Sequence, residues 1–141
     1  MSADEAERLG ASHSKHFLEL WDQIRPLPGA RELLSTLTAM RVPWAIATSG
    51  SIVTAKGPLG MLGIPEGTPI ITRDQVAYAK PNPDLFLAAA ERLHIPPGDC
   101  FVVGDSIWDL LAAQRAGAYR VYDDPADLLA HADELGMRAA G

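Results

Sequence analysis

A chain of 141 residues is long enough for one domain, and 48% hydrophobic with 21% charged residues is the composition of an ordinary globular protein. The net charge of −6 argues against an extended surface for nucleic acid or membranes, because both attract clustered lysine and arginine; phosphate esters need only local positive charge. The single cysteine, Cys100, excludes an internal disulfide. No long apolar run and no signal-peptide pattern occurs, so we expect a soluble, cytoplasmic protein.

The first elements in chain order are helical. Apolar side chains at helical spacing predict an amphipathic helix over residues 3–24, docked on the rest of the protein. Helices and short apolar strands then alternate. Further helices are expected at residues 30–40, 52–62, 83–93, 107–116 and 125–136, and strands at 42–48, 70–72, 100–103 and 120–122. This alternation predicts an α/β protein with a mostly parallel sheet.

Several local signals set the expected helix ends. Gly57-Pro58 should break or delay the helix over residues 52–62. Asn82 is expected to cap the next helix, with Pro83 at its first position. Gly117 should stop the helix that begins near Ile107, and Asp124-Pro125 should cap the last helix, which is expected to end near Gly136.

The most specific motif is an acidic pair. The apolar run 100–103 ends in Gly104, Asp105 follows directly, and Asp109 comes about one helical turn later. Carboxyl ends of parallel strands commonly carry sites, and two carboxylates there suggest a hard cation such as Mg²⁺. The alternative is helix capping by Asp105 or Ser106. Trp108, between the two acids, is expected to serve packing.

A second motif follows the strand over residues 42–48. Thr48, Ser49 and Gly50 place a hydroxyl and free backbone N–H groups where a strand opens into a loop, an arrangement that can hold a phosphoryl oxygen. The same residues also favour turns for purely local reasons, so the motif has a structural alternative.

The third motif is Lys80, which precedes Pro81-Asn82-Pro83-Asp84. The two prolines restrict the backbone directly after the lysine and hold it at the entry of a helix. A lysine held in this way could neutralise a phosphoryl group as a point charge. The alternative is a solvated surface lysine.

In chain order, Thr48, Lys80 and Gly104-Asp105-Ser106-x-x-Asp109 resemble motifs two, three and four of the haloacid dehalogenase-like (HAD-like) hydrolases. The resemblance covers roughly residues 26–136 and is nearest to the branch of phosphoglycolate phosphatase-like and β-phosphoglucomutase-like enzymes. It implies a Rossmann-like, three-layer αβα core over residues 25–141. Residues 1–24 resemble the last helix of that branch's helical cap.

The resemblance also implies roles for the motif residues. Thr48, Ser49 and Gly50 would hold the phosphoryl group, and Lys80 would stabilise its charge and that of the nucleophile. Asp105 would bind Mg²⁺ directly, and Asp109 would orient the metal's ligand shell or bind through water. The implied activity is a phosphatase of a small phosphorylated metabolite that works through an aspartyl-phosphate.

One family feature is absent from the sequence. No apolar strand ends in the Asp-x-Asp that supplies the nucleophile, and in the family this strand is the middle of the sheet, between those ending at Thr48 and Gly104. We therefore expect a truncated chain with little or no activity by itself. We also expect that the two flanking strands pair directly, that a second chain completes the sheet, or that the chain is only marginally folded.

Three other functions stay open. The chain could be a non-catalytic remnant that binds phosphate or a protein partner, because the nucleophile motif and the sheet centre are missing. Haloacid dehalogenase activity is a minor family-level alternative, which the Gly104-Asp105-x-x-x-Asp109 site does not favour. A phosphoacceptor receiver-like domain also places acids, a threonine and a lysine at strand ends, but in an order and spacing that this sequence does not match.

Overall fold

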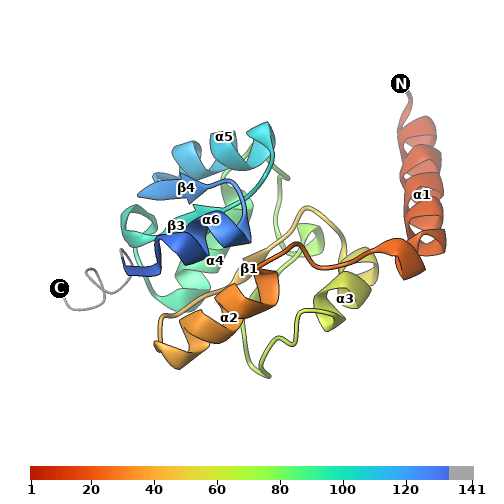
Figure 1. Ribbon diagram of the computed structural model, residues 1–141. Coiled ribbons are helices and arrows are strands. Elements are labelled where there is room, and N and C mark those ends of the chain that lie inside the picture. The colour runs from red at the N-terminus through yellow and green to blue at the C-terminus, as the bar shows by residue number, and fades with distance from the viewer. Residues whose placement is uncertain (134–141) are drawn as a thin grey trace.

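The computed structural model describes residues 1–133, and the expected end of the last helix near Gly136 lies outside them. The fold is α/β, as predicted (Figure 1). The helices are α1 (Ala3–Glu19), α2 (Ala30–Ala39), α3 (Ile52–Gly60), α4 (Asp84–Leu93), α5 (Ile107–Ala116) and α6 (Pro125–Ala130). The strands are β1 (Ile46–Ala47), β2 (Ile70–Ile71), β3 (Phe101–Val103) and β4 (Arg120–Tyr122). Short 3-10 turns lie at Trp21–Gln23, Arg73–Gln75 and Pro97–Asp99.

The strands form two separate parallel pairs. β1 pairs with β2, with Ile46 opposite Ile70, and β3 pairs with β4, with Val102 opposite Val121. Within the described residues, β1 and β3 are not hydrogen-bonded to each other. The expectation that these two strands pair directly is therefore wrong.

Two apolar clusters hold the two pairs together. The first joins α2 and α6 to β4 through Leu33, Leu37, Leu128 and Tyr122. The second joins β2 to α4 through Ile71, Leu85 and Ala89, with Ala47 of β1 and the preceding Ala45 packed against it. Since α2 and α4 both reach the region between the strand pairs, helices bound that region on two sides.

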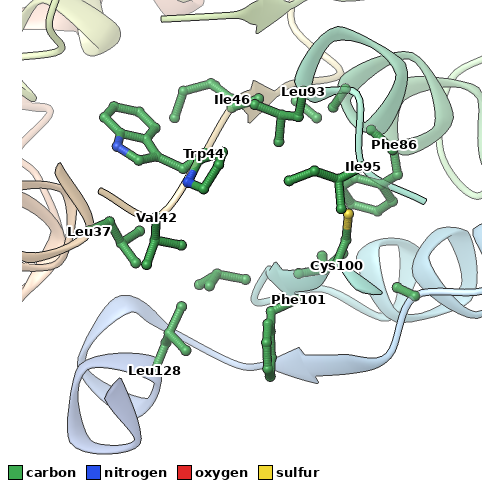
Figure 2. Close-up of a pocket in the computed structure, with 18 of the residues that line it drawn as sticks. Leu37, Val42, Trp44, Ile46, Phe86, Leu93, Ile95, Cys100, Phe101 and Leu128 are labelled. Atoms are coloured by element: carbon green, nitrogen blue, oxygen red, sulfur yellow. The ribbon is translucent and has the colours of Figure 1, made fainter. Parts of the chain in front are cut away.

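A cavity of about 890 Å³ lies between β1 and β3. Close-packed interiors contain few voids larger than a water molecule, so this space, which is partly open to solvent, marks a gap in the packing between the two strand pairs. Figure 2 shows Trp44 and Ile46 on one side of it, Cys100 and Phe101 on another, and Phe86 of α4 at its wall. The lining is mostly aliphatic and aromatic.

β1 is shorter than the predicted strand over residues 42–48. Only Ile46 and Ala47 pair, because β2 offers just two residues on one side and no strand lies on the other among the described residues. Both residues of β1 are half-buried, although strands of parallel sheets are normally covered on both faces. The length of this strand is therefore limited by its partners and not by its sequence.

α1 forms as predicted but is not docked along its length. None of its residues is buried, and Figure 1 shows the helix standing away from the core. Its Ser2–Glu5 capping box explains why the helix begins where it does. The helix itself approaches α3, and just after it Trp21 lies against Gly57 of α3; a Cβ at Gly57 would overlap the indole ring. The proposed boundary between a cap remnant and a core at residues 24/25 stays a prediction.

Three local expectations are wrong. α3 runs without a break through Pro58, because this proline lies in the last turn, where its ring costs only one helical hydrogen bond. Asn82 does not cap α4; its backbone N–H and its side-chain amide both donate to the Ala79 carbonyl, and Pro83 is the N-cap. Trp108 is not packed but 56% exposed.

Candidate active site

Lys80 joins the ends of the two strand pairs. Its Nζ lies 2.6 Å from Asp109 Oδ1 and donates to the Ala47 carbonyl at 3.3 Å. Ala47 ends β1 and precedes Thr48, while Asp109 lies in the first turn of the helix that follows β3. The lysine side chain is 14% exposed and its Nζ stands 5.0 Å from the centre of the Phe86 ring, so it is not a solvated surface lysine.

The acidic loop after β3 is tightly built around Asp109. Ser106 caps α5 by accepting from the Asp109 N–H at 3.2 Å, and its hydroxyl and N–H donate to Asp109 Oδ2 at 2.7 and 3.2 Å. Of the two residues that could cap this helix, Asp105 and Ser106, it is Ser106 that does so. A Cβ at Gly104 would lie 2.5 Å from the Asp109 Cβ, so only glycine leaves room for this side chain.

The surroundings of Asp109 also set its acidity. Burial alone would raise the pKa of Asp109, but hydrogen bonds from Lys80 and Ser106 and the lysine charge outweigh it and hold the pKa below its ordinary value. The carboxylate is therefore ionised at neutral pH. A buried anion paired with a buried cation at the end of a strand is the strongest electrostatic feature of this site.

Thr48 forms a turn at the end of β1. Its N–H donates to the Ile71 carbonyl at 2.9 Å, which completes the pairing with β2, and its Oγ1 accepts from the Gly50 N–H at 3.1 Å. Ser49, between them, is exposed. The hydrogen bond from Gly50 stabilises the turn locally, as expected for residues that favour turns. The turn also places the Thr48 hydroxyl next to Ala47, whose carbonyl accepts from Lys80.

Two further strand-end residues belong to the same edge. Thr72 follows β2 and is fully buried, and its hydroxyl donates to Asp74 Oδ2 at 3.3 Å. The same carboxylate oxygen accepts from the Ile52 N–H at 2.7 Å, at the start of α3. Sequence reasoning missed both residues. Thr72 could have been found by the pattern that marks Thr48 and Asp105, which is a polar residue just after an apolar strand.

The candidate residues do not all touch. Lys80 and Asp109 are in direct contact and Thr48 is one residue from a Lys80 contact, whereas Asp105 is exposed and makes no hydrogen bond or ion pair within residues 1–133. No cluster of three or more His, Cys, Asp or Glu side chains placed to hold a metal occurs in that part of the chain. Mg²⁺ usually takes one or two carboxylates and completes its shell with water and phosphate oxygens, so these donors fit it with Asp105 as the direct ligand.

A family model described as a haloacid dehalogenase-like hydrolase matches residues 2–117. The chain belongs to the haloacid dehalogenase-like hydrolases. Hexitol phosphatase A of Escherichia coli is 38% identical over 105 residues, which are 74% of this chain and 49% of that protein. A phosphoglycolate phosphatase of Xylella fastidiosa is 33% identical over 109 residues, 71% of this chain and 48% of that protein.

Solved structures agree with this family. A hydrolase from Pseudomonas syringae is 44% identical and superposes with a TM-score of 0.83, over 95% of this chain and 74% of that one. The Rossmann-like HAD fold, expected from the three motifs, is thereby confirmed in incomplete form. The chain spans about half the length of the phosphatases that it matches.

No helix within residues 1–133 has both the length and the apolar character that a membrane span requires.

Proposed function

We propose that this chain carries the phosphate-binding and metal-binding residues of a Mg²⁺-dependent phosphatase that acts on a small phosphorylated metabolite. The observation that supports this most is the position of Lys80, whose Nζ reaches both the end of β1 beside Thr48 and Asp109 beyond β3. Motifs two, three and four are far apart in sequence. A single ammonium group links their three segments.

Each residue has a task that follows from its surroundings. Thr48 offers its hydroxyl, and the Ser49–Gly50 turn offers backbone N–H groups, to phosphoryl oxygens. Lys80 supplies a positive charge in a largely buried place, where charge stabilisation is stronger than in water. Asp109 holds the lysine in position. Mg²⁺, when bound at Asp105, would neutralise further phosphoryl charge.

The attacking group is not among these residues. By resemblance it is an aspartate that follows a central strand, and no such motif occurs in the 141 residues. Loss of a nucleophile usually costs several orders of magnitude in rate, so the 141-residue chain should turn over substrate very slowly or not at all.

The substrate class is supported by the relatives. The names of two of them, a hexitol phosphatase and a phosphoglycolate phosphatase, both describe the removal of phosphate from small molecules. The site as built would recognise the phosphoryl group shared by such substrates. Discrimination between different phosphorylated substrates would depend on parts of the protein other than these strand ends.

Hydrolysis of an aryl phosphate, with and without Mg²⁺, tests the proposal. We expect activity only in a version extended upstream in its gene, only with Mg²⁺, and lost in the same version carrying Asp105→Ala. Asp123→Ala is the matched control, because Asp123 is also an exposed acid after a strand, β4, but lies outside the motifs. It should leave the activity unchanged.

Three results would contradict the proposal. Metal-dependent turnover by the 141-residue chain, abolished by Asp105→Ala, would mean that a nucleophile lies within the chain. An extended version that binds orthophosphate but hydrolyses nothing would favour a non-catalytic phosphate-binding protein. Release of halide from a haloacid in place of phosphate would favour the dehalogenase alternative.

A further inference from the structure

The turn after β1 can serve a phosphoryl group only while its backbone keeps one shape. Thr48 Oγ1 accepts from the Gly50 N–H at 3.1 Å, and a hydroxyl that accepts in this way can still donate its own hydrogen. Ser49, at the tip of the turn, is exposed, so packing does little to fix it. The shape of the turn therefore depends on the hydrogen bonds that reach it from neighbouring segments.

The segment that follows β2 supplies those hydrogen bonds. Three of them join successive parts of the turn to successive residues of that segment: Thr48 N–H to the Ile71 carbonyl at 2.9 Å, Arg73 N–H to the Gly50 carbonyl at 3.1 Å, and Ile52 N–H to Asp74 Oδ2 at 2.7 Å. The first two use only backbone atoms. The third is the one that depends on a side chain, that of Asp74.

The Asp74 carboxylate ties the start of α3 to the end of β2. Its Oδ2 accepts both from the N–H of Ile52, the first residue of α3, and from the hydroxyl of Thr72 at 3.3 Å. Thr72 is fully buried, so it fixes the carboxylate relative to the core. A negative charge is favoured at a helix N-terminus, and hydrogen bonds to a carboxylate are short and strong.

The exposure of Asp74 separates its effect on the turn from its effect on folding. The residue lies at the surface, and substitutions at exposed positions usually change stability little. Activity is more sensitive to position, because a displacement of about 1 Å in a binding group can cost about a hundredfold in rate. Loss of this carboxylate should therefore be seen in the site before it is seen in the fold.

We propose that Asp74 is a positioning residue of the candidate active site. By accepting from Ile52 and Thr72, it holds the turn after β1 in the shape that presents the Thr48 hydroxyl and the Ser49 N–H to a phosphoryl group. Its own negative charge would repel that group, so it acts through the turn and not on the ligand. The inference deepens the phosphatase proposal and rests on it for the ligand.

Kinetics of the version extended upstream in its gene test the role, at a temperature well below the unfolding transition. Asp74→Ala should lower kcat/KM at least about tenfold, with little change in the unfolding temperature. It should also weaken inhibition by orthophosphate, which binds the same turn. Asp74→Asn keeps an oxygen that can accept from both donors, so it should retain most of the activity.

Asp124→Ala is the matched control. Asp124 also caps a helix, α6, by accepting from the Asp127 N–H at 2.8 Å, but it lies outside the motifs. Its loss should leave kcat/KM unchanged. A second measurement needs no substrate: in the 141-residue chain, the N–H of Gly50 should exchange faster in Asp74→Ala than in wild type or in Asp124→Ala.

The inference fails on any of three results. Asp74→Ala could retain the kcat/KM of the wild type. Asp74→Asn could lose as much activity as Asp74→Ala, which would mean that the charge acts directly. The exchange of Gly50 could be the same with and without Asp74, which would mean that the turn is held by other contacts. An inactive extended wild type would instead contradict the phosphatase proposal, and the exchange of Gly50 would then decide the inference alone.

Discussion

Lys80 and Asp109 show how one residue pair can organise a site. The carboxylate is 11% exposed and the lysine 14%, so each charge depends on the other for compensation. Ser106 satisfies the second oxygen of Asp109 and Gly104 gives its side chain room. The pair thus fixes the lysine between the two strand ends before any ligand arrives.

Asp109→Asn should lower the free energy of unfolding at pH 7 by about 1.5–3 kcal/mol, since a charged hydrogen bond is lost and Lys80 is left unpaired. The effect should depend on pH. The pKa of Asp109 is lower in the folded chain than the value of about 3.9 expected when unfolded. Its stabilisation is therefore complete above about pH 4 and is lost as the pH falls through the folded pKa.

Urea unfolding of both proteins at pH 7 and pH 3 measures this difference. We expect the gap between wild type and variant to narrow at pH 3, because the unfolded chain takes up a proton at Asp109 more readily there than the folded chain does. A gap that stays constant or widens in acid would show that the ionised carboxylate does not stabilise the fold.

The sequence singles out Thr48, Asp105 and Asp109 by their places after strands, and Lys80 by the prolines that follow it, but it does not predict how these residues contact one another. The ion pair between Lys80 and Asp109 was not predicted, because it depends on how segments far apart in sequence are folded together. The exposure of Trp108 escaped prediction for a similar reason: an aromatic residue is buried only if something covers it.

At the scale of elements, helix ends followed the sequence where a local cap decides them. Ser106 and Gly117 bound α5 as predicted, and Gly117 adopts a φ of 79°, which favours glycine. β4 has the predicted bounds, and β2 and β3 match theirs to within one residue, whereas the length of β1 did not follow its sequence, because pairing depends on a neighbouring strand. β1 has two residues where the apolar run predicts seven (42–48).

Gly57 in α3 allows a test of the contact between α3 and Trp21, which follows α1. Gly57→Ala would ordinarily stabilise a helix by up to about 1 kcal/mol, but here the new methyl group would displace Trp21. We expect a net loss of roughly 1–2 kcal/mol in the free energy of unfolding, from lost burial of the indole.

Gly60→Ala is the matched control, because Gly60 ends the same helix and nothing lies within 4 Å of a Cβ there. This variant should be neutral or stabilising in urea unfolding. In a Trp21→Ala background, Gly57→Ala should also become stabilising. If Gly57→Ala destabilises equally with and without Trp21, the indole contact is not what requires glycine.

At the scale of the whole molecule, the chain has the outer parts of a parallel α/β sheet and a cavity at its centre. From the resemblance to the family, we expected that the central strand is absent from this chain. In the structure the two strands that would flank it, β1 and β3, are not paired with each other. Helices α2 and α4 keep the space open by packing on different strand pairs. β1, which ends directly before Thr48, and β3, which ends just before Asp105, line this cavity from the two strand pairs.

Amide hydrogen exchange of the 141-residue chain alone tests whether the inner edges of β1 and β3 are unpaired. The N–H groups that pair within the two sheets, those of Ile46, Thr48 and Gly104, should exchange slowly. The N–H groups that face the cavity, those of Ala45, Ala47, Phe101 and Val103, should exchange much faster. Equal and strong protection of both sets would mean that the inner edges of β1 and β3 are already paired, in contradiction to the two separate strand pairs.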